Sequence, residues 1–203
     1  MAAPPRETSA GREAAPDDVP FTRVAIVGMG LMGGSLGLAL KARSPRTTVV
    51  GVARRRSVVD LALQMGAADE ATTDLAEGVG QADLVVLSTP VRTLIRRIPE
   101  VAGSMQPGAV VTDMGSTKAA IMRAMAQAPW SIQPVGGHPM CGKEVAGLEV
   151  AEATLYEGAT WPLTPLERTD PAATAGMRAL VQAVGARPIM IEPDRHDRLQ
   201  RPA

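Results

Sequence analysis

The stretch TRVAIVGMGLMGGSLGLAL, which covers Thr22–Leu40, decides the fold. Its apolar and mostly β-branched beginning, Val24–Val27, predicts a buried strand, and the residues behind the glycine cluster follow a helical pattern. Between the two, Gly28, Gly30 and Gly33 have the spacing G-x-G-x-x-G. This spacing indicates a dinucleotide site when it follows a strand and opens a helix, as it does here.

Each of these glycines has a physical role in such a site. Gly28 permits the tight turn after the strand, Gly30 has no Cβ to block an approaching pyrophosphate, and Gly33 lets the helix pack close to the strand. The first helical turn begins with Leu31 and Met32, and its unpaired N–H groups would face the diphosphate. We therefore interpret the rest of the chain around a cofactor site at this loop.

Length and charge set further bounds. The 203 residues suit one domain, or one domain and a fragment of a second. The 21 basic and 21 acidic residues cancel, so no global field favours a nucleic acid or a membrane surface as partner. We assign no metal ligands.

Compartment is indicated by cysteine usage and by the N-terminus. The single cysteine, Cys141, excludes an intrachain disulfide and suits a reducing compartment. No apolar run approaches the roughly 20 residues of a membrane span. Residues 1–20 lack the apolar core of a secretory signal and have the composition of a disordered tail. We expect a cytoplasmic protein.

Strand-like and helix-like segments alternate along the chain. This alternation predicts a Rossmann-like, doubly wound α/β domain with a mainly parallel sheet over residues 21–192. Besides the first strand, the expected strands are Thr47–Val52, a short strand followed by a loop in Ala67–Asp74, a stretch within Asp83–Pro90, Ala109–Asp113, Ser131–Val135, Ala159–Thr164 and Arg187–Ile191. The expected helices are Leu31–Lys41, Val58–Met65, Val91–Ala102, Ala119–Gln127 and Asp170–Val184.

The end of the second strand bears on the choice of cofactor. An acidic residue there usually holds the ribose hydroxyls and selects NAD. This chain has Ala53 followed by three arginines, of which Arg54 and Arg55 are the expected contacts. Arginine binds a 2′-phosphate through paired, charge-assisted hydrogen bonds, so we predict NADP in preference to NAD. The alternative is a solvated basic start to the next helix.

Polar residues also follow the strand within Asp83–Pro90. Cofactors sit beyond the carboxyl ends of parallel strands, so Ser88, Thr89 and Pro90 are expected to line the cofactor groove. The alternative is that they only cap the helix that follows.

Two later strand ends carry polar candidates. Ser116 lies near the nicotinamide side, although a serine at a helix start is often only an N-cap. Lys118 would place a positive charge there, or would be an ordinary surface lysine. His138 lies between glycines and a proline at the next strand end, where an imidazole suits the handling of a substrate hydroxyl.

Together with the glycine loop, the motifs DMGSTK (Asp113–Lys118) and GGHPMCG (Gly136–Gly142) resemble the prephenate/arogenate dehydrogenase family over Thr22–Gln200. The resemblance implies NADP-dependent oxidative decarboxylation of a cyclohexadienol, with a hydride passed to the nicotinamide, in tyrosine biosynthesis. His138 matches the catalytic histidine that takes the proton of the ring hydroxyl, and Ser116 matches the serine that helps to position this hydroxyl and the imidazole. Glu144 matches an acidic position that some members have near the active-site entrance. The basic end of the second strand resembles the branch that often prefers arogenate.

The family continues into a helical domain that forms a homodimer, closes the pocket and supplies an arginine for the substrate. Residues 193–203 resemble the start of its first helix, with the pair His196–Asp197 matching a recurrent pair. We expect the rest of that domain to be absent, and its apolar contact surface on this domain to be exposed. Two alternatives remain, an NADP-binding module without catalysis and another two-domain hydroxy-acid dehydrogenase.

Overall fold

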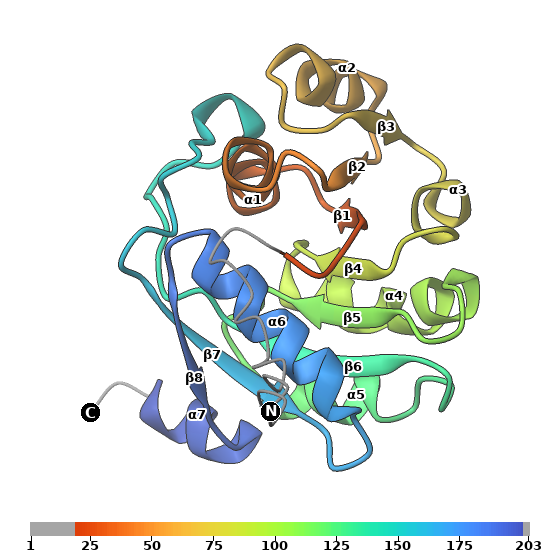
Figure 1. Ribbon diagram of the computed structural model, residues 1–203, viewed down its shortest axis with the longest axis vertical. Helices are drawn as coiled ribbons and strands as arrows, with labels where there is room; N and C mark the ends of the chain where they lie inside the picture. Colours follow the sequence, from red (N-terminus) through yellow and green to blue (C-terminus); the bar gives the residue numbers. More distant parts are fainter. Residues whose placement is uncertain (1–18, 201–203) are drawn as a thin grey trace, which may run out of the picture.

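A single sheet of eight strands runs through the computed structural model, which describes residues 19–200 (Figure 1). The strands are β1 (Arg23–Val27), β2 (Thr48–Val52), β3 (Glu70–Thr72), β4 (Leu84–Leu87), β5 (Val110–Asp113), β6 (Gln133–Gly137), β7 (Thr160–Pro165) and β8 (Arg187–Met190). The helices are α1 (Leu31–Arg43), α2 (Arg56–Gln64), α3 (Leu75–Val79), α4 (Val91–Ser104), α5 (Ala119–Met125), α6 (Pro171–Ala183) and α7 (Pro193–Leu199), with a short 3₁₀ helix η1 (Leu148–Val150).

The order of the strands fixes where a ligand can bind. They lie in the order β3-β2-β1-β4-β5-β6-β7-β8, and every neighbouring pair is parallel except β6 and β7. The predicted doubly wound, mainly parallel sheet is therefore confirmed. The chain reverses its direction of travel across the sheet between β1 and β4, and the crevice beyond the carboxyl ends of such strands is where open α/β sheets bind ligands.

Helices cover both faces of the sheet because side chains alternate along each strand. Val24 and Ile26 of β1 are fully buried in a core with α1, α2 and α6. Ala25 and Val27 point the other way, into a second core with α3, α4 and α5. Figure 1 shows the two layers, with α1 and α6 on one side of the sheet and α3 to α5 on the other.

The beginning of the described chain bears on the expected tail. Residues 1–18 lie outside the described residues, but Val19 is buried in the core with α6 and Phe21. The packed part of the chain thus includes a residue that the sequence analysis placed in the tail. Across residues 19–200, no helix has the length and apolar character needed to cross a membrane.

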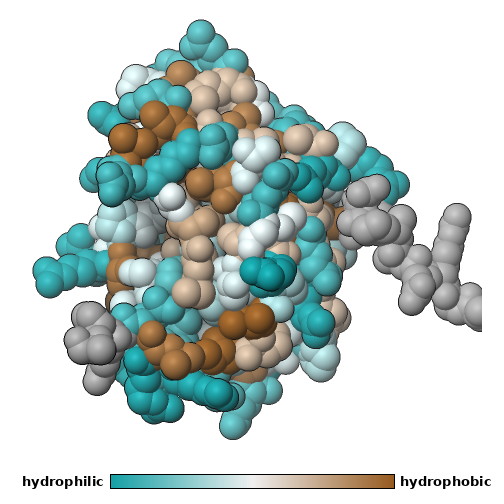
Figure 2. All heavy atoms as spheres, turned by 90° about the vertical axis from the view of Figure 1, so that its left-hand side faces the viewer, coloured by the Kyte–Doolittle hydropathy of each residue, from teal (hydrophilic) through white to brown (hydrophobic). Residues whose placement is uncertain are grey.

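Several large hydrophobic side chains are exposed among the described residues. Ile189 and Met190 belong to β8, Leu199 belongs to α7, and Met140 and Val145 lie in the segment after β6. Figure 2 views the left-hand side of Figure 1 and shows hydrophobic residues gathered in patches, one of them a band across the lower part of this face. Exposed apolar patches of this kind mark interaction surfaces.

Candidate active site

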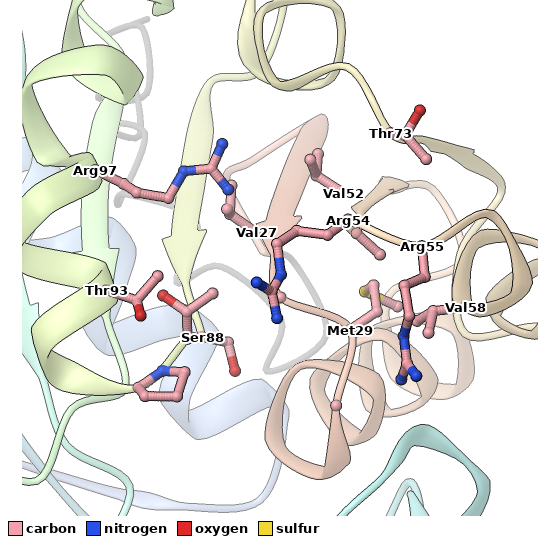
Figure 3. A pocket seen from close by; sticks show the side chains of 15 residues that line it. Val27, Met29, Val52, Arg54, Arg55, Val58, Thr73, Ser88, Thr93 and Arg97 are labelled. Atoms are coloured by element: carbon pink, nitrogen blue, oxygen red, sulfur yellow. The ribbon is translucent and has the colours of Figure 1, made fainter.

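The first pocket lies at the carboxyl ends of β1, β2 and β4 and has a volume of about 320 Å³ (Figure 3). It is the crevice that the strand order predicts. Seven of the predicted cofactor residues line it: Gly28, Gly30, Arg54, Arg55, Ser88, Thr89 and Pro90. The structure adds residues that the sequence analysis did not single out, among them Thr93 and Arg97 of α4 and Thr73 after β3.

The three glycines of the loop are required for different reasons. Gly28 has φ +107°, and a Cβ there would lie 2.6 Å from the carbonyl oxygen of Ser88. A Cβ on Gly33 would lie 2.1 Å from the carbonyl oxygen of Gly28, so this glycine permits the close contact between α1 and the loop. A Cβ on Gly30 would meet no protein atom within 4 Å. Gly30 therefore leaves open space at the pocket, whereas Gly28 and Gly33 are needed for the packing of the protein itself.

The N-terminus of α1 opens at the same place. Its N-cap is Gly30, and no side chain caps the helix. Leu31 and Met32, at the start of α1, line a second pocket that shares Gly30 and the segment 88–90 with the first. The two pockets thus form neighbouring parts of one groove that passes the helix N-terminus, where N–H groups and the helix dipole favour an anion.

Arginines from two elements face the first pocket. Arg54 and Arg55 follow β2 and are exposed, and Figure 3 shows the guanidinium of Arg54 extending into the pocket. Arg97 reaches the pocket from the opposite side, from α4. Arg56, the third arginine of the run, instead forms an ion pair with Asp60 one turn further along α2, at 2.9 Å.

His138 lies directly after β6, on the same edge of the sheet, and lines neither of these two pockets. Its ring is half-buried, and its Nδ1 is 2.9 Å from Nε2 of His196. Burial lowers the pKa of His138 from 6.5 to about 4, with further lowering from the charge of Lys118 and from His196 whenever that ring carries a proton, against an opposing effect of Asp197. The ring is therefore neutral at pH 7, as a general base must be.

Lys118 is a wholly buried residue, and its interpretation as a surface lysine was wrong. Its ammonium forms an ion pair with the buried carboxylate of Asp113 and donates to the carbonyl oxygen of Gly137 at 2.5 Å. Asp113 also accepts hydrogen bonds from the N–H groups of Gly115 and Gly137. Burial raises the pKa of the Asp113 carboxyl and lowers that of the Lys118 ammonium, and their mutual attraction opposes both shifts. The pair joins the ends of β5 and β6.

Ser116 is exposed in the loop between β5 and α5. The alternative that it caps α5 was wrong, because the helix begins at Ala119 with Lys118 as N-cap. The first N–H groups, those of Lys118 and Ala119, donate instead to the carboxylate of Asp197, at 2.6 and 2.9 Å. The cap is supplied by α7, from a distant part of the chain.

Glu144 is exposed in the segment after β6, between Lys143 and Val145, which line the second pocket. Glu144 itself lines neither pocket. Met114, after β5, is a further residue of the second pocket that the sequence analysis did not single out. Its position directly after a buried strand was the signal that would have found it.

The chain is similar to known proteins in sequence and in fold. The family model described as "Prephenate dehydrogenase, nucleotide-binding domain" matches residues 36–190. The prephenate dehydrogenase of Bacillus subtilis (strain 168) is 32% identical over 176 residues, which cover 86% of this chain and 47% of that protein. This chain thus spans about half the length of that relative.

Two solved structures are also similar. The arogenate dehydrogenase of Synechocystis superposes with a TM-score of 0.82 and 33% identity, over 87% of this chain and 62% of that one. The prephenate dehydrogenase of A. aeolicus, in complex with hydroxyphenyl propionate and NAD+, gives a TM-score of 0.78 and 30% identity, over 88% and 62%. The chain belongs to the prephenate dehydrogenase family, of which it contains the nucleotide-binding domain.

Proposed function

We propose that the chain is the NADP-binding part of a dehydrogenase that oxidatively decarboxylates prephenate or arogenate. The position of His138 carries this proposal. A neutral, half-buried imidazole lies at the strand edge that also forms the groove, and its second ring nitrogen is not used in the bond to His196. The similarity to a prephenate dehydrogenase and to an arogenate dehydrogenase supports the reaction class.

The residues of the groove fit a dinucleotide. Gly30 leaves open space beside the uncapped N-terminus of α1, which suits a diphosphate. Ala53, Arg54 and Arg55 at the end of β2 offer no carboxylate to a ribose and two guanidinium groups to a 2′-phosphate, which favours NADP over NAD. The bound cofactor would accept the hydride from the substrate ring.

The protein's own residues would handle the proton and the orientation of the substrate. His138 takes the proton of the ring hydroxyl as the carbonyl forms, and Ser116 positions that hydroxyl. Glu144 is exposed after β6 and matches the acidic position that some members of the family have near the site entrance. The exposed apolar residues of β8 and α7 support a contact with further protein, which we assign to the helical domain and homodimer of the family.

The test is the appearance of NADPH absorbance when the chain receives NADP+ with arogenate and then with prephenate, followed by the same assays with NAD+. Turnover with either substrate supports the proposal and identifies the preferred one. A higher kcat/KM with NADP+ than with NAD+ supports the role of the arginines, and the reverse contradicts it. Protein that is folded and binds NADP, yet turns over neither substrate, would leave the second candidate, an NADP-binding module.

A further inference from the structure

A chain of hydrogen bonds connects His138 to α7. Nδ1 of His138 lies 2.9 Å from Nε2 of His196, and Nδ1 of His196 lies 2.8 Å from a carboxylate oxygen of Asp197. His196 is 1% exposed, and the rings of the two histidines meet edge to face. In the sequence, the pair His196–Asp197 is identified only by its match to a recurrent pair of the family, which assigns no role to either residue.

The donors and acceptors along this chain have one consistent arrangement when both rings are neutral. A carboxylate only accepts hydrogen bonds, so Nδ1 of His196 carries a proton and its N–H donates a hydrogen bond to Asp197. Nε2 of His196 is then an acceptor, and Nδ1 of His138 must be the donor. Nε2 of His138 is left without a proton, since a neutral imidazole has one protonated nitrogen.

Asp197 is itself held in place. Its carboxylate accepts the N–H groups of Lys118 and Ala119 at the start of α5, in addition to the ring of His196. Burial acts to raise the pKa of Asp197, but these hydrogen bonds outweigh it and the pKa lies below its ordinary value. The carboxylate is therefore charged at neutral pH and lies between α5 and α7 as a fixed acceptor.

We infer that His196 and Asp197 are positioning residues that fix the tautomer of His138, with Nε2 as the free, unprotonated nitrogen. This inference rests on the proposed function for its consequence, because only Nε2 is then available to a substrate hydroxyl. One proton moves from that hydroxyl to Nε2, and His138 becomes the cation. The charged groups around the ring are Lys118 and Asp197, and His196 is its titratable neighbour. A ring with its proton on Nε2 could not accept.

The direct test is nitrogen NMR of the imidazole rings in the ¹⁵N-labelled chain, which contains only two histidines. At pH 7 we expect the ring of His138 to be neutral, with its proton on Nδ1. A proton on Nε2 of His138, alone or with Nδ1, would overturn the inference. This readout needs no substrate, so it separates failure of the inference from failure of the proposed function.

Variants at His196 extend the test. His196→Leu removes the acceptor, so the Nε2–H form of His138 should become the major one. His196→Gln offers a side-chain oxygen at a similar reach and should keep the proton on Nδ1. The same tautomer in wild type and His196→Leu would contradict the inference. Should His196→Leu fail to fold, the wild-type and His196→Gln spectra still decide the question.

Turnover gives the second readout. His196→Leu should lower kcat by at least about tenfold with little change in KM for NADP, because a base in the wrong tautomer cannot accept the proton. His196→Gln should recover most of this loss. Asp194→Asn is the matched control, since it removes an exposed carboxylate from the same helix, and it should change neither the tautomer nor kcat. Equal losses in the Leu and Gln variants would overturn the positioning role.

Discussion

The two ends of the candidate site differ in how their polar groups are bound. The glycine end, which we define by Gly28, Gly30, Gly33, Arg54 and Arg55, leaves its polar groups accessible. The N-terminus of α1 has no side-chain cap there, the two arginines are exposed, and a Cβ on Gly30 would meet no protein atom within 4 Å. Donors and cations that are left free in this way are available to an anionic ligand.

The histidine end, which we define by Asp113, Lys118, His138, His196 and Asp197, binds its polar groups to one another. Asp113 and Lys118 are fully buried and form an ion pair, and the other three form the hydrogen-bonded chain to α7. The two ends are therefore organised differently. The glycine end offers open space and unpaired donors that a ligand can bind, and the histidine end holds the ring of His138 in place without a ligand.

The largest effect is expected at His138. Replacing it with Asn removes the base and should lower kcat by about 10²- to 10⁴-fold. The affinity for NADP should stay nearly unchanged, because His138 lines neither pocket of the groove. NADPH absorbance gives the rate and calorimetric titration gives the affinity. Activity that persists in His138→Asn would refute the role of His138 as the base. A parallel loss of NADP binding would show that the histidine end also contributes to binding the cofactor.

The buried ion pair should be the next most sensitive feature. Lys118→Met leaves the carboxylate of Asp113 buried without its cation and should lower the free energy of unfolding by about 3–5 kcal/mol. Denaturant unfolding measures this change. The control is Lys143→Met, which breaks the ion pair with the partly exposed Glu152 and should cost about 0–1 kcal/mol. Similar losses of unfolding free energy in the two variants would mean that breaking the buried ion pair costs no more than breaking the exposed one.

Two glycines of one loop give a sharper test of the glycine end. Gly33→Ala places a methyl group 2.1 Å from the carbonyl oxygen of Gly28 and should destabilise the fold by about 1–3 kcal/mol. Gly30→Ala meets open space, so its stability should stay within about 0.5 kcal/mol of wild type. Its NADP affinity should nevertheless fall by about tenfold or more, since the methyl group occupies the place proposed for the diphosphate. Thermal unfolding and cofactor titration check both, and unimpaired NADP binding by Gly30→Ala would contradict the proposed site.

The glycine end could be predicted from the sequence because its determinants are local. The strand, the turn and the helix that hold Gly28, Gly30 and Gly33 follow one another within a short stretch, and each glycine acts through its own backbone. The parallel sheet followed in the same way from apolar runs that alternate with helical patterns. The antiparallel direction of β7 was not specified, because it depends on how a later segment returns to β6.

The histidine end could be predicted only in part, because its determinants are distant in the chain. His138 was identified from its place at a strand end, but its partner His196 is 58 residues further on. Ser116 resembled an N-cap until Asp197, 79 residues from Lys118, was seen to accept the N–H groups of α5. Lys118 resembled a surface residue since nothing in its neighbours showed that Asp113 would be buried beside it. Pairings of this kind are set by tertiary structure.

The smallest effect we expect separates two neighbouring arginines of the glycine end. Arg54→Ala should lower the affinity for NADP by about tenfold or more and the affinity for NAD much less. The reason is that only NADP has a 2′-phosphate with which the arginine can form a charge-assisted hydrogen bond. Arg56→Ala is the matched control, since Arg56 pairs with Asp60 and does not line the pocket, so both affinities should change little. Titrations with both cofactors at one ionic strength measure the difference, because salt screens exposed charges. Equal losses of NADP and NAD in Arg54→Ala would mean that the arginine acts on the shared diphosphate or only on the surrounding field. The accessible donors and cations of the glycine end would then favour any anionic ligand, without selecting NADP over NAD.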